Sequence, residues 1–262
     1  LTMTAGPLIR KISAEERAPQ GIPQSAEKQR RHIHTIDGTV LLLLAKIRPR
    51  YWSWGWNRIA LGSWLTRQQS GLRFIKTLGS GIDGGFGLTP SPSHQGMLCV
   101  FDSDDSARTY IHDSPLIAKY RQRSDELFIA TLRPASVRGS WDGLSLTAGA
   151  GLALESMVAT LTRASIRPAA AMAFWRHAPA AQHDLMTAPG CDLAVGLGEA
   201  PILRQATFSL WKNTAVMDAY ARSGAHMEAI RAAWKHEFFS ESMFVRFEPL
   251  HMQGQWKGKD FG

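Results

Sequence analysis

Apolar and polar residues alternate along the C-terminal half of the chain with the period of half-buried strands. In residues 205–211, Ala206, Phe208 and Leu210 are separated by polar positions, so one face of the segment is apolar. The same reasoning predicts further strands at 159–166, 191–197 and 243–247, and helices that begin near residues 172 and 214.

Prolines and glycines mark where these elements should end. Pro168 and Pro249 each follow a predicted strand, and a proline has no backbone N–H for a continuing ladder. We expect Gly198 to turn the chain and Thr214 to cap a helix. The resulting order in this half is strand, helix, strand, strand, helix, strand.

Short landmarks recur in both halves of the chain in the same order. Ala45-Lys-Ile-Arg-Pro49 returns 119 residues later as Ala164-Ser-Ile-Arg-Pro168, and Gly139-Ser-Trp141-Asp-Gly143 returns 115 residues later as Gly254-Gln-Trp256-Lys-Gly258. Between them, Leu78-Gly79 matches Leu197-Gly198, and the segment that ends in Phe101 matches the one that ends in Trp211. Ordered self-similarity of this kind indicates an internal duplication.

The predicted unit of each half is a ferredoxin-like β-α-β-β-α-β fold, whose antiparallel sheet has helices on one face only. The bare face needs a cover, and two fused copies can cover each other sheet to sheet. We therefore predict an α+β protein in which two fused ferredoxin-like repeats form a pseudo-dimeric α/β barrel, with a cavity between the sheets and the helices. The expected divisions are an extended N-terminal arm at 1–38, repeats at 39–143 and 159–262, and a connection at 144–158.

Composition narrows the functional classes. The 262 residues are 44% hydrophobic and carry a formal net charge of +8, but the basic residues are scattered and no nucleic-acid recognition motif occurs. Attraction to anionic lipid headgroups accounts for this charge as well as a plain basic surface does. The longest apolar run, residues 40–45, is far shorter than the roughly 20 residues of a membrane span. We expect a cytoplasmic protein without nucleic-acid partners, with peripheral attachment to the inner membrane as an option.

Two cysteines, Cys99 and Cys191, form no CxxC or CxxCH motif, which excludes a cysteine zinc site and covalent haem attachment. Among the histidines, His226 shares an apolar helical face with Ile230 and Trp234, at spacings i, i+4 and i+8. Neutral imidazole is a common metal ligand. A core histidine bonded to a backbone carbonyl gives the same pattern, so both interpretations stay open.

Histidines in polar stretches, such as His94, are expected to be exposed. Gly79-Ser-Gly81-Ile-Asp-Gly84 matches the GxGxxG pattern of dinucleotide-binding loops, which requires a helix directly after the glycines. The prolines at 90 and 92 make such a helix unfavourable, so we expect a loop at the mouth of the cavity. Glu199 is interpreted as either a solvated turn residue or a site carboxylate.

An aromatic cluster at residues 51–56 either lines a pocket for a long apolar ligand or packs the first helix on the sheet. Arg50, Arg58 and Arg176 are candidates to pair with ligand carboxylates through their forked guanidinium groups, or are surface charges.

Taken together, these residues resemble the spheroidene monooxygenase family of carotenoid biosynthesis, over about residues 41–260. The matching stretches are Leu78-Gly-Ser-Gly-Ile-Asp-Gly-Gly-Phe86, Leu161-Thr-Arg-Ala-Ser-Ile-Arg-Pro168, Phe174-Trp-Arg176, Gly196-Leu-Gly-Glu-Ala-Pro201, Gln205-Ala-Thr-Phe-Ser-Leu-Trp211, His226-Met-Glu-Ala-Ile230 and Gly254-Gln-Trp256. The charged arm at 1–38 departs from the family pattern.

This resemblance implies an oxidoreductase, a haem monooxygenase that introduces a keto group into an acyclic carotenoid. It implies haem b with its iron as cofactor, a ferredoxin-like electron donor, and a membrane from which the apolar substrate arrives. The family's histidine carries over onto His226 as the axial metal ligand. Gln205 and Arg176 carry over as catalytic candidates, and Trp175 as a pocket residue beside the cofactor. Arg50 and Arg58 remain candidates to bind the haem propionates.

Two other functions remain open. One is a haem-dependent dehydratase of the aldoxime type, because fused ferredoxin-like haem proteins also resemble aldoxime dehydratases. The other is a non-catalytic subunit or adaptor of a membrane complex that derives from the monooxygenase family. Oxygen consumption separates the two enzymes, and haem binding separates both from the adaptor.

Overall fold

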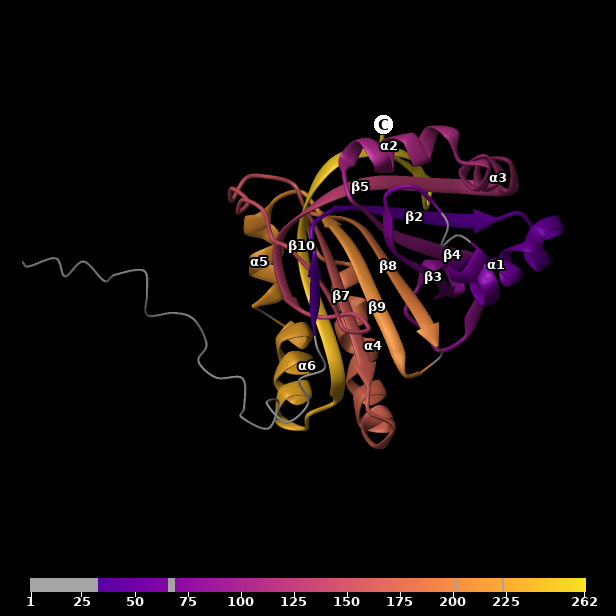
Figure 1. The fold of residues 1–262 in the computed structure, drawn as a ribbon. Coiled ribbons are helices and arrows are strands. Elements are labelled where there is room, and N and C mark those ends of the chain that lie inside the picture. The colour runs from indigo at the N-terminus through magenta and orange to yellow at the C-terminus, as the bar shows by residue number, and fades with distance from the viewer. Residues whose placement is uncertain (1–32, 66–68, 201, 223) are drawn as a thin grey trace, which may run out of the picture. The chain divides into compact units, whose positions relative to one another are not determined.

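The computed structural model describes residues 33–65, 69–200, 202–222 and 224–262 (Figure 1). The first repeat contains β2 (Thr39–Ile47), α1 (Trp52–Leu65), β3 (Leu72–Gly81), β4 (Pro90–Phe101), α2 (Asp104–Asp113), α3 (Pro115–Arg123) and β5 (Ser124–Gly139). The second contains β7 (Val158–Ile166), α4 (Ala171–Met186), β8 (Cys191–Ala200), β9 (Arg204–Trp211), α5 (Thr214–Ala221), α6 (Gly224–Lys235) and β10 (Phe239–Trp256). The short strands β1 (His34–Ile36), β6 (Leu144–Leu146) and β11 (Lys259–Asp260) complete the described elements.

Most of the predicted N-terminal arm, residues 1–32, lies outside the described residues. The end of that arm forms β1, which pairs in parallel with β6 from the predicted connection. The two segments assigned outside the repeats therefore contact each other. Where one repeat ends and the next begins stays a prediction.

The long strands close into an antiparallel barrel. Within the first repeat their order is β5-β2-β4-β3, and within the second it is β10-β7-β9-β8, which is the ferredoxin-like arrangement in both. The repeats join through the β5–β10 ladder on one side and through β3 and β8 on the other. At the second seam a single backbone pair, Gly79 with Gly198, connects the strands. The predicted α+β barrel of two fused repeats is confirmed.

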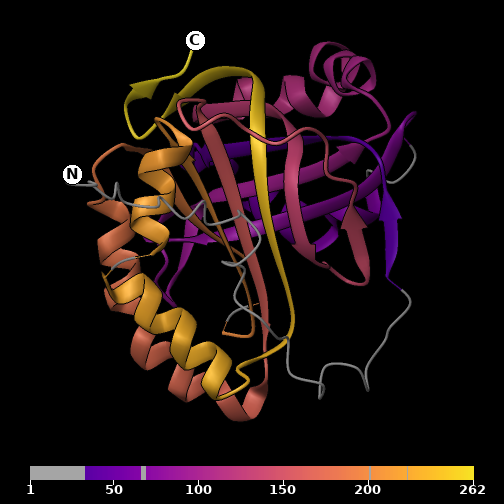
Figure 2. The ribbon, with the colours of Figure 1, turned by 90° about the vertical axis from the view of Figure 1, so that its left-hand side faces the viewer.

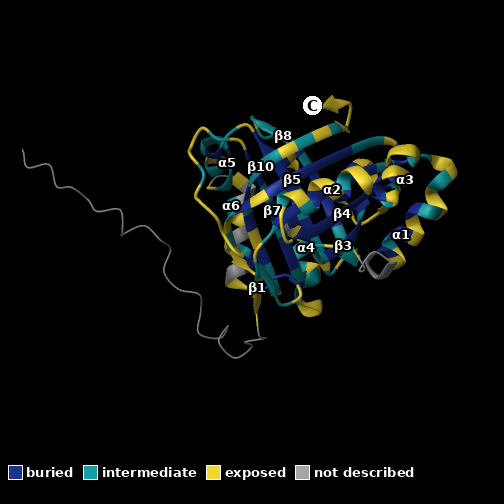
Figure 3. Ribbon diagram, turned by 45° about the horizontal axis from the view of Figure 1, so that its top comes forward, coloured by how far each residue is buried: buried dark blue, intermediate teal, exposed yellow. Residues whose placement is uncertain are grey.

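Alternating side chains give each strand an inner and an outer face. In β2, Leu42 and Leu44 point into the barrel, where residues of both repeats form one continuous apolar cluster. Leu41 and Leu43 belong instead to a second cluster with α1, α2 and α3. Figure 3 shows these first-half strands as buried and the outward sides of α2 and α3 as exposed. The barrel interior is a packed core and holds no channel.

The repeats end in equivalent hairpins. Gly139 and Gly254 have φ values of 82° and 92°, and a Cβ on either would lie 2.0 Å from a carbonyl oxygen of a neighbouring strand. Only glycine fits such a position. Two residues later, Trp141 and Trp256 are 1% and 2% exposed and cover the barrel core.

Three predicted boundaries were wrong. Strand β8 continues through Gly198, because its pairing with β9 extends past that residue. Strand β10 continues through Pro249, whose missing N–H is tolerated because the ladder with β5 shifts register there. Asn213, and not Thr214, caps α5, since its Oδ1 accepts from the Val216 N–H at 2.9 Å.

The helices cover the two halves of the barrel differently. Helix α1 packs on β3 and β4, and α2 and α3 pack on the other first-half strands. In the second half, α4 and α6 lie side by side (Figure 2), and α6 packs mainly on α4 instead of on the sheet.

Candidate functional site

Four helix-facing positions of the second-half sheet carry small or polar side chains where the first half carries large apolar ones: Ala194, Thr160, Thr162 and Thr207. Residues that pair across the strands form three rows in each half. In the first half, each row is read across the strands in the order β3, β4, β2, β5. The rows are Ile75-Cys99-Leu41-Thr131, Thr77-Met97-Leu43-Ile129 and Gly79-Gln95-Ala45-Leu127. In the second half, the equivalent strand order is β8, β9, β7, β10. The rows are Ala194-Ser209-Thr160-Arg246, Gly196-Thr207-Thr162-Phe244 and Gly198-Gln205-Ala164-Ser242.

The middle row shows most clearly that these smaller side chains leave part of the sheet exposed. Leu43 and Met97 are 0% exposed, whereas their counterparts Thr162 and Thr207 are partly exposed. Phe244, on the same row, is 38% exposed although it lies in a strand that is paired on both sides. A packed interior leaves no such exposure beneath covering helices. We therefore place the candidate site between the second-half sheet and helices α4, α5 and α6.

One end of this sheet surface is polar and internally bonded. The hydroxyls of Thr160 and Ser209 lie 2.7 Å apart, and the Trp211 indole N–H donates to Ser209 Oγ at 2.9 Å. Arg246 reaches up to α5, where its guanidinium bonds Asp218 at 2.6 Å. The middle of the surface, in contrast, is neutral and only weakly polar.

His226, the predicted axial ligand, is the third residue of α6. Its side chain is outside the described part of the structure, as are those of Ile230 and Trp234, so its role as metal ligand stays a prediction.

Three predicted site residues lie around the same space. Gln205 is on the third row, and its amide N–H donates to the Ala200 carbonyl at 3.4 Å. Trp175, on α4, donates from its indole to the Ile202 carbonyl at 3.0 Å. Arg176, the next residue, is exposed and lies 3.7 Å from the Met172 sulfur. The structure thus brings Gln205 and Trp175 to the same β8–β9 hairpin, and Arg176, next to Trp175 on α4, lines a hollow with Arg167 and His236.

The other two predicted residues lie in the first repeat. Arg50 is exposed and stacks over the Tyr51 ring at 4.8 Å. Arg58 is 7% exposed in the first-half core, where its guanidinium donates to the Gly62 carbonyl at 3.3 Å and lies beside Tyr120. The structure does not bring them together with Gln205 and Trp175, and their role in cofactor binding stays a prediction.

A basic hollow of about 500 Å³ opens at the start of α4. Its described lining includes Arg167, Arg176 and His236, with Glu237 as the acidic member. Guanidinium groups in such a hollow can pair with carboxylates of a ligand.

Neither cysteine is set up as a metal ligand. Burial raises the pKa of Cys191 to about 11 and that of Cys99 further, so both are neutral thiols near pH 7. Across the described residues, no three His, Cys, Asp or Glu side chains gather into a metal-binding group.

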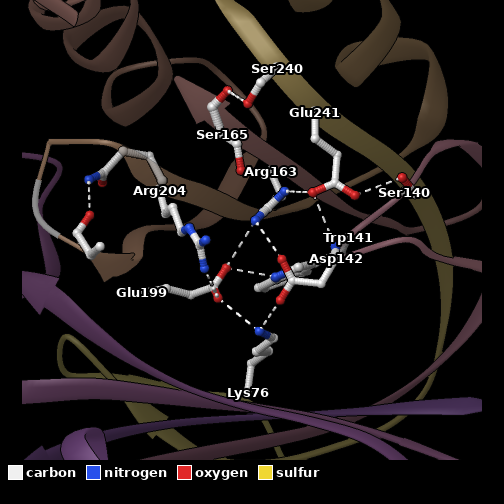
Figure 4. Close-up of polar contacts among 12 residues, drawn as sticks. Lys76, Ser140, Trp141, Asp142, Arg163, Ser165, Glu199, Arg204, Ser240 and Glu241 are labelled. Atoms are coloured by element: carbon white, nitrogen blue, oxygen red, sulfur yellow. Dashed lines mark hydrogen bonds and ion pairs between the residues drawn. The ribbon is translucent and has the colours of Figure 1, made fainter. Parts of the chain in front are cut away.

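A cluster of six charged side chains closes one end of the barrel (Figure 4). Its centre is Arg163, which is 1% exposed and bonds Glu241 at 2.6 Å, Glu199 at 3.3 Å and Asp142 at 3.4 Å. The remaining cations are Lys76, which bonds Glu199 at 2.9 Å and also contacts Asp142, and Arg204, at 3.7 Å from Glu199. Three cations face three carboxylates, so the cluster is neutral.

Backbone and indole donors complete the cluster. Glu241 accepts from the Gly143 N–H at 2.9 Å, and Glu199 accepts from the Trp141 indole at 2.7 Å. Burial acts to raise the pKa of Glu241, but hydrogen bonds from Gly143, Ser140 and Arg163 outweigh it and hold the pKa below its usual value. A carboxylate so stabilised is a poor proton acceptor, so we interpret the cluster as structural.

Two sequence interpretations are corrected by these contacts. Glu199 is neither a solvated turn residue nor a free site carboxylate, because it lies in β8 and bonds Trp141 and Lys76. His94 is not exposed: it is 5% exposed in β4, with Nδ1 at 3.0 Å from Ser91 Oγ. The prolines before it lie at the start of a strand and not in a loop.

The glycine-rich motif spans the end of β3 and a short 3-10 helix (Ile82–Gly84), and β4 is the next element, so no α-helix begins there to bind a pyrophosphate. The prediction that no helix follows these glycines directly is confirmed. In the described part of the chain, no helix is both long and apolar enough to cross a membrane.

Comparison with known proteins gives two close relatives over most of the chain. A spheroidene monooxygenase of Rubrivivax gelatinosus is 50% identical over 87% of this chain and 89% of its own length. One of Rhodobacter capsulatus is 35% identical over 72% of this chain and 80% of its own length. No family model matches the chain.

Among solved structures, an aldoxime dehydratase has a TM-score of 0.56 at 8% identity, covering 92% of this chain and 88% of that protein. This likeness concerns the fold alone, and it agrees with the duplicated barrel. The sequence identity carries the family assignment: the chain belongs to the spheroidene monooxygenase family.

Proposed function

We propose that this protein is a haem-dependent monooxygenase that introduces a keto group into an acyclic carotenoid. Its family membership supports the reaction class, because the relatives at 50% and 35% identity are spheroidene monooxygenases. The observation that carries the site is the exchange of Leu43 and Met97 for Thr162 and Thr207 in the second half, which leaves room beneath α4 and α6.

The residues present fit a haem in this space. A flat macrocycle needs a broad floor without protruding side chains, and the second-half rows supply Ser209 and Thr207 on β9 and Thr160, Thr162 and Ala164 on β7. Gly85 and Phe86 lie over Gly196 on β8 and border this floor. Imidazole on α6 is a suitable donor for haem iron, whereas the two cysteines are protonated thiols.

In this proposal His226 would ligate the iron, Trp175 would lie against the cofactor, and Arg176 would pair with a propionate. Haem in such a site supplies the activation of molecular oxygen for oxidation of a C–H bond. Gln205 would orient the substrate through its amide oxygen, because its N–H is already bonded to Ala200.

Formation of a ketone from a methylene group would take two successive oxygenations. Each uses one molecule of oxygen, a pair of electrons and two protons, and releases water; the first leaves an alcohol, and the second a geminal diol that loses water. The electrons would come from a ferredoxin-like donor. The threonine-lined floor contributes no charged group beside the reacting carbon, so the surroundings disfavour water and charged side products.

The test is an absorption spectrum of protein purified from haem-supplemented cells, together with His226→Ala. The matched control is His183→Ala, because His183 is exposed on α4. We expect a Soret band in the wild type and in the control, and a weakened or shifted band with loss of turnover in His226→Ala. A His226→Ala protein that keeps both haem and turnover contradicts the ligand assignment. A folded wild type without a Soret band contradicts the proposed function.

The aldoxime dehydratase alternative rests on fold likeness at 8% identity, which carries no argument about activity. Oxygen uptake during turnover distinguishes it, since a dehydratase consumes none.

A further inference from the structure

A narrow slot of about 120 Å³ lies at the seam where β3 of the first repeat meets β8 of the second. Its described lining includes Trp56, Leu88, Ile202, Gly196, Gly198 and Gln205. Pockets for compact small molecules are several times larger, so this slot suits only a slender group.

The slot carries no charge that a ligand could use. Among its described lining residues only Glu199 is ionisable, and its carboxylate already bonds the Trp141 indole and Lys76. The remaining lining is apolar side chains, glycine backbone, two serines and the amide of Gln205. An ionic ligand would lose its hydration here without compensation, whereas an apolar chain would not.

Glycines keep the walls of the slot close together. A Cβ on Gly81 or Gly196 would lie 2.6 Å or 2.5 Å from the Gly85 carbonyl oxygen, so the loop after β3 can rest on β8 only with glycine at both positions. Two further glycines have no close neighbour: a Cβ would be in ordinary contact at Gly79 and in open space at Gly87. A Cβ on Gly79 would have its nearest neighbours at 3.9 Å, and one on Gly87 would have none within 4 Å.

The outer end of the slot has an apolar rim. Trp56 from α1, Leu88 from the loop before β4 and Ile202 from the β8–β9 connection are 44%, 49% and 44% exposed. Three large apolar side chains from separate elements, exposed around one opening, are typical of a binding surface for an apolar partner.

The inner end of the slot is part of the candidate site. Gly196, Gly198 and Gln205 line the slot and also lie on the helix-facing rows, directly beside Thr207 and Ala164. The slot therefore reaches the third row of that surface at Gln205, while Gly85 and Phe86 lie over Gly196.

We propose that this slot threads the ring-free end of a long apolar chain from the rim at Trp56 to the candidate site at Gln205. The identity of the chain as an acyclic carotenoid rests on the proposed function. A slot of this volume admits the end of an extended chain and is too small for a chain end that carries a ring. The slot, and not the site beyond it, then selects acyclic substrates and sets how far the chain end reaches.

The test fills the slot without disturbing its walls. Gly79→Val and Gly87→Leu place side chains where a Cβ has no close neighbour, and Gly151→Leu is the matched control, because Gly151 also has nothing within 4 Å and does not line the slot. All three proteins should unfold at the wild-type temperature. Binding of the linear polyene cis-parinaric acid is measured by its fluorescence, with squalene and β-carotene as acyclic and ring-ended competitors.

We expect squalene, but not β-carotene, to displace the probe, and both slot variants to bind it at least about tenfold more weakly than the control. Folded slot variants that bind the probe like the wild type overturn the inference, and so does equal displacement by β-carotene. The Soret band reads out the proposed function separately. Loss of probe binding in the slot variants of a protein without a Soret band would support the slot while contradicting the haem assignment.

Discussion

Arg163 and Glu241 lie 2.6 Å apart at the end of the barrel, Arg163 on β7 and Glu241 on the adjacent strand β10. Arg163 is 1% exposed and Glu241 13% exposed, so the pair is almost fully withdrawn from water. The same guanidinium reaches Glu199 on β8 and Asp142 after β5. One side chain thus links strands from both repeats where the barrel closes.

Replacement of Arg163 by Met should destabilise the fold by about 3 kcal/mol, because it leaves buried carboxylates without their cation. The measurement is urea-induced unfolding followed by circular dichroism. Arg133→Met is the control: Arg133 on β5 pairs with Glu248 on β10, so it shares one strand with the Arg163 pair, but both side chains are about half exposed. Its cost should stay below about 1 kcal/mol. Equal costs for the two variants would show that the cluster contributes nothing beyond an ordinary surface pair.

Acid should destabilise the protein in two stages. Burial is the main cause that lowers the pKa of His94 from its ordinary 6.5, assisted by Lys46 and Lys257 and opposed by Asp83 and Glu126. The unfolded chain then binds a proton at this histidine more readily than the folded protein does, so stability is fully present above about pH 6.5 and falls below it. In His94→Gln the unfolding temperature should change less between pH 7 and pH 5.5 than in the wild type; an unchanged slope would rule out this histidine as the cause.

The second stage comes from Asp142 and Glu241. Burial acts to raise both pKa values, but Lys76 and Arg163 at Asp142, and Gly143, Ser140 and Arg163 at Glu241, lower them below the ordinary 3.8 and 4.5. The two carboxylates stabilise the folded protein above those pH values. This stabilisation is lost as the pH falls through their lower folded-state pKa values. Glu241→Gln should flatten the unfolding curve below about pH 4.5 while leaving the first stage intact. If Glu241→Gln loses as much stability below that pH as the wild type does, the assignment to Glu241 is contradicted.

The two barrel tryptophans should respond differently to replacement by Phe, despite their equivalent positions. Trp141 donates to Glu199 at 2.7 Å, whereas the Trp256 indole nitrogen is buried without a hydrogen-bond partner among the described residues. Trp141→Phe removes a hydrogen bond to a charged acceptor, so it should cost about 1–3 kcal/mol more than Trp256→Phe. Chemical denaturation of both variants checks this, and a larger cost at Trp256 would contradict it.

Substitution of second-half residues by the larger residues at the equivalent first-half positions should fill the candidate site. Thr162→Leu and Thr207→Met introduce the residues found at the equivalent Leu43 and Met97. The haem-free protein should become more stable by about 1 kcal/mol, because apolar surface is buried beneath the helices, and the Soret band should disappear. Thr109→Leu, on the exposed side of α2, should change neither property. A double variant that binds haem like the wild type would place the cofactor elsewhere.

Much of the architecture could be predicted from the sequence because both repeats need the same residue types at equivalent positions. Gly139 and Gly254 are matched in the sequence, and each accommodates the same close approach of a neighbouring strand. The alternation in residues 205–211 correctly separates barrel-facing Phe208 from helix-facing Thr207. The candidate floor was missed, although a signal was present: Leu43 and Thr162 occupy equivalent positions at the repeat offset of 119 residues, and so differ in size where the fold is the same.

The sequence by itself determined the repeat, the order of its elements and the face on which each side chain of residues 205–211 lies, because these depend on residues close together in the chain. Only the tertiary structure decided that Arg163 bonds residues 142, 199 and 241, that His94 is buried, and that Gly79 meets Gly198 at a seam bordered by a slot. Those contacts join residues that the closing of the barrel brings together across long stretches of chain. No local pattern of hydrophobicity encodes which distant partner a charged or small residue will meet.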